Sequence, residues 1–554
     1  MTETRREVGR AASVIGAITV ASRLAGFGRT MVFTWAVGYF TLGTAYQNAN
    51  NIPNIIFELV AGGALSALVI PLLAAPLARH KPEQVSRIAS ALITWSLTLL
   101  VPVGLAVAVF SRPLIEAIGG SRVTPATIDV GTELLILFAP QIPLYGVAVV
   151  LTGVLQSHRR FAWPALAPLL SSVVMGGVYV IYGLSSGRSL YAESIGQGEI
   201  LLLGLGTTAG VAVLAGCLIF PLRGLNLRFR PTWRLETHVA AGLKSLAIAG
   251  AITVGAQQLC QVLLMRLANN AGDGPVVIFT VSQTFFLLPW AVLAVPLATA
   301  AYPVLAEAFS LGEIDRYQRR LSQTGRAVLL LSGLGVAALA GLAEPIATVL
   351  ASVAAGDDGV DGANAQLHLE YTLTGLAFGL FGYSMFAIYS RGLYAVGRNK
   401  YAAGATSIGW AAGAVAAVVL SQVMPLEDRT LALAIAWSIG MTVIGLALTA
   451  AIARHTGMAS LAGIPRAALA TVVAAVAAVL AARELIVLWG HADTIYTALF
   501  QGVVVGAATA VVYLGIGALI GGSGVVRPVL RRAGRIRSST EDEAHQPDED
   551  GADQ

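Results

Sequence analysis

Long apolar runs follow one another along almost the whole chain. Each run holds about 20 residues, enough to cross roughly 30 Å of hydrocarbon, and none alternates between apolar and polar residues as a barrel strand does. The pattern predicts an all-α polytopic membrane protein with fourteen transmembrane helices. The expected spans are 12–36, 47–77, 89–110, 130–155, 164–184, 200–220, 240–268, 277–308, 326–352, 370–394, 403–423, 431–453, 466–488 and 497–520.

The composition agrees with a protein surrounded mainly by lipid. The 554 residues are 56% hydrophobic and 12% charged, whereas a soluble domain carries about 25% charged residues. Cys217 and Cys260 lie in separate apolar runs, so neither a disulfide framework nor a zinc site is expected. No P-loop, catalytic triad or acid–base cluster is present in the sequence. We therefore expect a transporter rather than an enzyme, with no nucleic acid partner.

Positive charge separates the loops into two sets. The intervening loops hold Arg112, Arg122, Arg188 and Arg429, while the other loops carry most of the arginines, among them Arg5, Arg79, Arg159, Arg223, Arg316, Arg398, Arg454 and Arg527. By the positive-inside rule the arginine-rich loops and both termini are cytoplasmic. The even number of spans agrees with this orientation.

Two weak internal echoes predict a duplicated architecture. The loop beginning GVLQSHRRFAW at Gly153 resembles GLYAVGRNKYA at Gly392, at an offset of 239 residues, and the segments around Pro71 and Pro303 match at an offset of 232. An offset of six spans gives two parallel six-helix lobes with the substrate site between them. We expect an N-lobe at 1–220, a C-lobe at 221–453, two extra C-terminal helices at 454–520 and a cytoplasmic disordered tail at 521–554.

Two arginines lie inside the first expected span, where a charge costs roughly 2.5–3.5 kcal/mol on insertion scales. Arg23 lies near mid-depth, and Arg29 lies about 120° around the helix from it unless Gly26 and Gly28 bend the helix. Guanidinium is always charged and forms bidentate bonds to phosphate, so we expect Arg23 to bind phosphate in a polar cavity. Arg29 either joins it or extends to the outer interface.

Amides and prolines mark the second span. Because proline removes a backbone donor, Asn51-Ile-Pro53-Asn54 is expected to break the start of this helix. The break is either a simple kink or a cavity wall whose amides bind sugar or peptide groups. Glu58 follows, and it either pairs with one of the two arginines or is a structural counter-charge.

Further polar residues occur in the seventh and eighth spans. Gln257, Gln261 and Arg266 recur at near-helical spacing, and Arg266 is either a substrate contact or an interface anchor. In the eighth span, Gln283 is a candidate contact and Pro289 a candidate hinge. The full set of expected hinges is Gly26, Gly28, Pro53 and Pro289. No metal site and no cofactor are expected.

Three segments resemble the MurJ/MviN family, the lipid II flippases of peptidoglycan synthesis within the multidrug/oligosaccharidyl-lipid/polysaccharide exporter superfamily. They are SRLAGFGR at Ser22, IPNIIFELVAGGALSALVIPLLA at Ile52 and GVLQSHRRFAWPALAPLLSS at Gly153. The resemblance implies that the family's first-helix arginines correspond to Arg23 and Arg29. Its Pro-Asn corresponds to Pro53 and Asn54.

The chain also departs from this family at charged positions. Thr30 replaces an acid, Asn51 a basic residue, Phe57 and Glu58 an arginine pair, and Thr284 and Leu287 an Arg and a Glu. Some relatives bind sodium through acids in the seventh and eleventh spans, and this chain has none there. A coupling ion or the membrane potential therefore remains unplaced.

The resemblance implies a flippase that moves lipid II from the inner to the outer leaflet of the bacterial plasma membrane by alternating access. The alternatives are a paralogue acting on another lipid-linked sugar, a drug/cation antiporter of the same superfamily, and a non-transporting cell-wall scaffold. The expected partners are a lipid-linked pyrophosphate sugar precursor, membrane lipids, and proteins of cell-wall synthesis and division.

Overall fold

The computed structural model describes residues 2–60, 65–185, 188–225, 227–234, 237–354, 359–492 and 494–521, and the expected tail lies outside them except for residue 521. The N-terminal half contains α1 (Thr2–Val37), α2 (Thr41–Glu58), α3 (Leu65–Ala78), α4 (Pro82–Val109), α5 (Ser111–Gly119), α6 (Pro125–Phe138), α7 (Gln141–Ser157), α8 (Ala162–Ser185) and α9 (Gln197–Gly216). The remainder contains α10 (Thr237–Asn269), α11 (Pro275–Pro289), α12 (Val295–Ser310), α13 (Ile314–Gly341), α14 (Ala343–Ala354), α15 (Gly359–Ala377), α16 (Gly379–Ala395), α17 (Asn399–Val423), α18 (Arg429–Thr456), α19 (Ile464–Trp489) and α20 (Ile495–Gly521).

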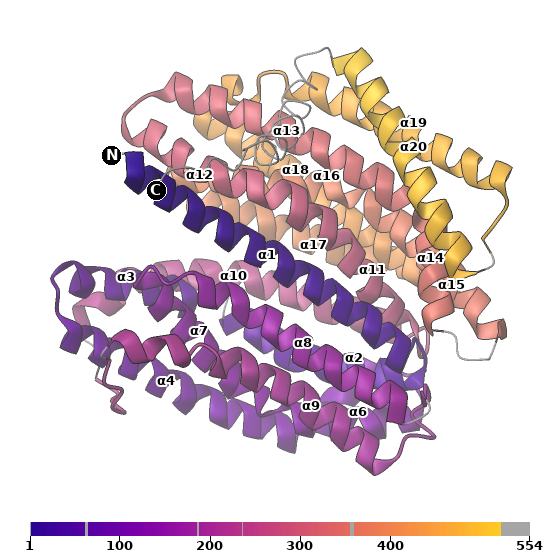
Figure 1. Ribbon diagram of the computed structural model, residues 1–554, viewed down its shortest axis with the longest axis horizontal. Coiled ribbons are helices and arrows are strands. Elements are labelled where there is room, and N and C mark those ends of the chain that lie inside the picture. The colour runs from indigo at the N-terminus through magenta and orange to yellow at the C-terminus, as the bar shows by residue number, and fades with distance from the viewer. Residues whose placement is uncertain are drawn as a thin grey trace, which may run out of the picture.

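The helices form two groups with α1 running diagonally between them (Figure 1). Helix α1 packs along α8 of the N-terminal half and also contacts α11 and α14 of the C-terminal half. Helices α16, α17 and α18 form the centre of the second group, and α19 and α20 pack against α13 at its edge.

The all-helical membrane architecture is confirmed, while the count of fourteen spans remains a prediction. Within the described residues, nine helices are long and apolar enough to cross a membrane. Two bent pairs, α6 with α7 at 41° and the α15–α16 pair at 42°, raise the number to eleven.

Two expected helix boundaries were wrong. Helix α2 continues through Pro53, and its irregularity is a π-type turn that begins at Leu59. The expected ninth span of 326–352 joins two separate helices, because α13 begins at Ile314 and ends before Leu342. The charged first turns of α13 concealed its start, since they extend the helix beyond its apolar stretch.

The backbone supports the internal repeat at matching turns. Lys81 N–H bonds to Pro76 O and Glu313 N–H to Ala308 O, with His80 and Gly312 at positive φ, an offset of 232. The turns at Arg159 and Gly397 also match, with bonds from Arg160 N–H to Leu155 O and from Arg398 N–H to Leu393 O. These are 6→1 bonds that end helices with a left-handed residue. The second offset is 238 rather than the expected 239, because the sequence alignment followed the arginines and not the turn.

Candidate functional site

Exposure falls along α1 from its N-terminal part towards its C-terminal end. Arg23 is exposed, Arg29 is half-buried, and Thr34, Ala36 and Val37 are buried. Two cavities border the middle of this helix. Arg23, which lines one of these cavities, therefore lies on the more accessible part of α1, towards its N-terminal end.

The deeper cavity, here called the polar chamber, has a volume of about 150 Å³. Helices α1, α2, α8 and α11 supply its walls. Its lining is rich in amides and hydroxyls: Arg29, Thr30, Phe33, Tyr46, Gln47, Asn50, Asn51, Asn54, Tyr179, Thr280, Val281 and Thr284. No acidic group is among these described lining residues. The chamber therefore offers one cation and many hydrogen-bonding groups to a ligand.

The second cavity, here called the basic chamber, has a volume of about 460 Å³ and lies nearer the N-terminal end of α1. It lies between α1, α8, α11 and the π-type turn after α11. Its lining includes Ser22, Arg23, Phe27, Pro164, Pro168, Ser172, Leu287 and Leu288. Arg29, Thr30 and Thr284 line both chambers, so the two cavities meet at the guanidinium of Arg29.

Arg29 has no carboxylate partner among the described residues. Its Nη1 donates to Met175 Sδ at 3.1 Å, and its buried Nε has no hydrogen-bond acceptor. Thioether sulfur is a weak acceptor, so most of the hydrogen-bonding capacity of this guanidinium is unused. A cation held in this way is suited to an anionic ligand that enters between the two halves.

The polar chamber is bounded by a rigid group of tyrosines. Tyr46 Oη lies 2.7 Å from Tyr179 Oη and 2.9 Å from Thr207 Oγ1, and Thr207 donates to Leu203 O. The ring of Phe33 packs against both tyrosines, at centroid distances of 5.0 and 5.4 Å. These contacts fix one wall of the chamber.

The amides of α2 are orientated individually. Asn51 Nδ2 donates to Gln47 O, one turn earlier, at 2.8 Å. Tyr145 Oη donates to Asn54 Oδ1 at 3.1 Å, and the ring of Tyr145 packs on Phe57. The bond from Tyr145 leaves the amide donors of Asn54 to face a ligand.

Hydrogen bonds join the two halves beyond the C-terminal end of α1, and we call this set the interlobe seal. Asn269 is fully buried, and its Nδ2 donates to Asn48 Oδ1 at 2.9 Å and to Ile118 O at 3.0 Å. Gly274 N–H donates to Thr44 Oγ1 at 2.8 Å. Gly274 has a φ of +108°, and a Cβ there would lie 2.9 Å from Tyr39 O, so the close approach requires glycine.

Two further contacts belong to the interlobe seal. Thr124 N–H donates to Asp273 Oδ2 at 3.1 Å, and Arg188 Nη2 donates to Val353 O at 3.0 Å. Burial raises the pKa of Asp273 above its ordinary value of 3.8, and nearby Glu193 adds to the effect, although the bond from Thr124 opposes it. The seal thus joins the two halves near the buried, C-terminal end of α1.

The structure brings together some of the predicted site residues but not all of them. Arg23, Arg29, Asn51 and Asn54 line the chambers. Glu58 interacts electrostatically with Arg23, but no hydrogen bond joins this pair among the described residues. Gln257, Gln261 and Gln283 are outside the described chamber linings, and Arg266 donates to Ala117 O at the seal.

The predicted hinges differ in their local backbone. Helix α1 passes through Gly26 and Gly28 without a break, and α2 passes through Pro53. Pro289 ends α11, and a π-type turn, Trp290–Ala294, follows it. Trp290 Nε1 donates to Tyr383 O at 3.0 Å and its ring stacks on Tyr383.

Sequence reasoning missed the contribution of α8. Ser172, Met175 and Tyr179 all face α1, at spacings of three and four residues. This spacing is the pattern of a single helical face. Tyr179 and Ser172 were therefore detectable as polar residues on one face of an apolar span.

Comparisons with known proteins agree on one family. A family model for the lipid II flippase MurJ matches residues 34–500. The "Lipid II flippase MurJ" of Burkholderia cenocepacia is 25% identical over 391 residues, which are 70% of this chain and 73% of that protein. The "Probable lipid II flippase MurJ" of Rhizobium meliloti is 26% identical over 342 residues, which are 61% of this chain and 62% of that protein.

Solved structures with the same fold include two transporters. A lipid II flippase MurJ in an inward closed conformation matches with a TM-score of 0.70 at 17% identity, covering 93% of this chain and 99% of that chain. An inward-facing multidrug resistance transporter of the MATE family, in the MOP superfamily, matches with a TM-score of 0.64 at 15% identity, covering 81% and 98%. At these identities the likeness concerns the fold.

Proposed function

The chain belongs to the MurJ family of lipid II flippases, and we propose that it moves lipid II from the inner to the outer leaflet by alternating access. The observation that carries the proposal is Arg29, a guanidinium with no carboxylate partner in the described part of the chain, at the junction of two chambers between the halves. A pyrophosphate is the part of such a substrate that this group would bind. The amides of Asn51 and Asn54 would bind the sugar or peptide.

We further propose the fourteen-span layout, with both termini in the cytoplasm. The arginine-rich loops support this orientation. In it, the chambers are loaded from the cytoplasmic side while the interlobe seal closes the outer side. The two arginines favour loading of an anion, and the membrane potential would help to reset the cavity at about 2.3 kcal/mol per charge per 100 mV. Proteins of cell-wall synthesis and division are the proposed partners.

The test is depletion of the protein from its cell, followed by measurement of lipid-linked precursors in each leaflet. A membrane-impermeant reagent that modifies outward-facing sugar reports the outer fraction, and total extraction reports the pool. We expect the outer fraction of lipid II to fall and the pool to rise. Re-expression of the wild-type chain should restore both values, and the Arg23→Ala variant should not.

Two outcomes would reject the proposal as stated. An unchanged outer fraction of lipid II would favour a scaffold that does not transport. A fall confined to a different lipid-linked sugar would assign the protein to that substrate instead.

A further inference from the structure

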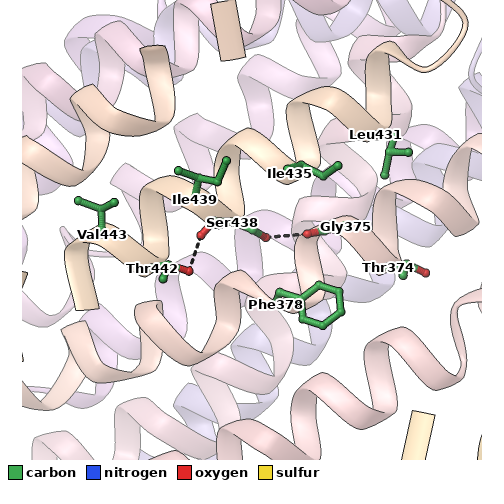
Figure 2. A pocket seen from close by; sticks show the side chains of 9 residues that line it. All are labelled: Thr374, Gly375, Phe378, Leu431, Ile435, Ser438, Ile439, Thr442 and Val443. Atoms are coloured by element: carbon green, nitrogen blue, oxygen red, sulfur yellow. Dashed lines mark hydrogen bonds between the residues drawn. The ribbon is translucent and has the colours of Figure 1, made fainter. Parts of the chain in front are cut away.

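A groove of about 450 Å³ lies between α15 and α18, away from both chambers. One wall is a stripe of α18 formed by Leu431, Ile435, Ile439 and Val443, and Phe378 lies opposite (Figure 2). At 1.5 Å per residue the stripe extends about 18 Å along the helix. Phe378 is 52% exposed and Ile439 is 39% exposed, so the groove opens sideways, towards the bilayer.

The polar groups beside the groove are satisfied within the protein. At the bend between α15 and α16, Ser438 Oγ accepts from Gly379 N–H at 3.0 Å and donates to Gly375 O at 2.6 Å. The hydroxyl is thus inserted into the helical bond that would join Gly379 to Gly375, a recognised cause of helix kinks. Because this break needs no water or polar ligand, the groove presents an apolar surface to its occupant.

A cation lies at one end of the groove. Arg483 of α19 donates through Nη2 to Thr374 Oγ1 at 3.2 Å, and Thr374 lines the groove near Leu431 (Figure 2). Arg483 also forms an ion pair with Glu370, whose Oε1 lies 4.0 Å from Nη2, too far for a hydrogen bond. Guanidinium has five donors, so Arg483 retains the capacity to bind an anion. Leu431 lies two residues from the start of α18, which places this end of the groove near the membrane surface.

We propose that the groove binds one anionic bilayer phospholipid, with its phosphate on Arg483 and one acyl chain along the stripe from Leu431 to Val443. An apolar channel about 18 Å long, open to the bilayer and with a cation at its surface end, matches the charge and shape of a phospholipid. None of the groove residues lines either chamber, so this site is separate from the one proposed for the substrate.

The experiment is a titration of the delipidated full-length protein with phosphatidylglycerol, read by native mass spectrometry. Arg483→Gln should weaken binding about tenfold, because it removes a charge-assisted bond to phosphate. Ile439→Trp should block the groove and weaken binding to a similar degree. Leu446→Trp is the matched control, because Leu446 is exposed on the same helix but outside the groove, and it should bind as the wild type does.

Two additional ligands identify the occupant. Diacylglycerol, which has no phosphate, should bind to the wild type more weakly than phosphatidylglycerol does. Its binding should be abolished by Ile439→Trp and unaffected by Arg483→Gln. Equal binding of phosphatidylglycerol by all variants would overturn the proposal. So would displacement of phosphatidylglycerol by polyprenyl phosphate at a concentration lower than that of the phospholipid, because this would assign the groove to a substrate tail. A phosphatidylglycerol analogue with a photoreactive acyl chain should label residues 431–443, and labelling elsewhere would also overturn it.

Discussion

Replacement of Arg29 by alanine tests the central role assigned to its guanidinium. The wild-type group is half-buried, donates to a thioether sulfur and has no described carboxylate partner. A charge-assisted hydrogen bond contributes about 1.5–3 kcal/mol. Loss of one such bond to pyrophosphate should therefore weaken binding of a lipid-linked pyrophosphate by about tenfold to a hundredfold. Arg29→Lys should recover part of this loss, because it keeps the charge but not the bidentate geometry.

The thermal stability of the same variants separates binding from folding. Removing one member of a buried ion pair is strongly destabilising, since it leaves the other charge uncompensated. Arg29 has no such partner within the described ranges, so the alanine variant should melt no lower than the wild type. Arg112→Ala is the control for binding, because Arg112 is exposed and paired with Glu116 and Asp129.

The assay is binding of a polyprenyl-pyrophosphate sugar to purified protein, together with melting in the absence of ligand. Unchanged binding by the Arg29→Ala protein would refute the assignment of this residue to the substrate. A lower melting temperature with normal binding would instead show that the guanidinium is structural.

Three further predictions concern the interlobe seal and the tyrosine wall. Asn269→Ala removes two buried hydrogen bonds of about 1 kcal/mol each and so weakens the interlobe seal. A membrane-impermeant maleimide added on the side of the seal should therefore label a Thr34→Cys probe faster in this variant. Asn399→Ala, at the opposite end of the molecule, should leave the labelling rate unchanged. Burial raises the pKa of Asp273, so the folded state holds this proton more tightly and stability falls as pH rises through the folded-state pKa. Asp273→Asn should make the melting temperature depend less on pH between pH 4 and 7. An unchanged dependence of the melting temperature on pH would contradict the reasoning. Tyr46→Phe should destabilise the protein by about 1–3 kcal/mol in denaturant unfolding, because it leaves the buried hydroxyl of Tyr179 without its hydrogen-bond partner, whereas Thr207 keeps its bond to Leu203 O. Equal stability of the variant and the wild type would contradict this.

The positions of most helices followed from the sequence because apolar run length is a local property. The two arginines of α1 were also local signals, since charge within an apolar run requires a polar surrounding. The prediction of the ninth span failed because it, too, relied only on the local run of apolar residues. Charged residues at the start of α13 and a short apolar helix after it shifted the apolar window away from the true helix.

Contacts between distant segments were beyond a single sequence. Asn48 and Asn269 are 221 residues apart, and nothing in either segment identifies the other as its partner. Arg266 was expected at a substrate site or an interface, and the sequence gives no sign of the bond that it makes to a backbone carbonyl of α5. The hydroxyl of Ser438 likewise gives no local indication that it completes a break in another helix.

The chemistry of the interlobe seal has a consequence for how the protein responds to its surroundings. Among the described residues, none of the hydrogen bonds that join the halves at this end pairs a cation with an anion. In the part of the chain that the structure describes, the charged groups at this end, Arg188, Arg266 and Asp273, each bond to a backbone group and not to an opposite charge. Dissolved salt screens the attraction between two exposed charges and has less effect on a direct hydrogen bond to the backbone. We therefore expect ionic strength to change the strength of this closure only slightly when a bacterium moves between fresh water and brine.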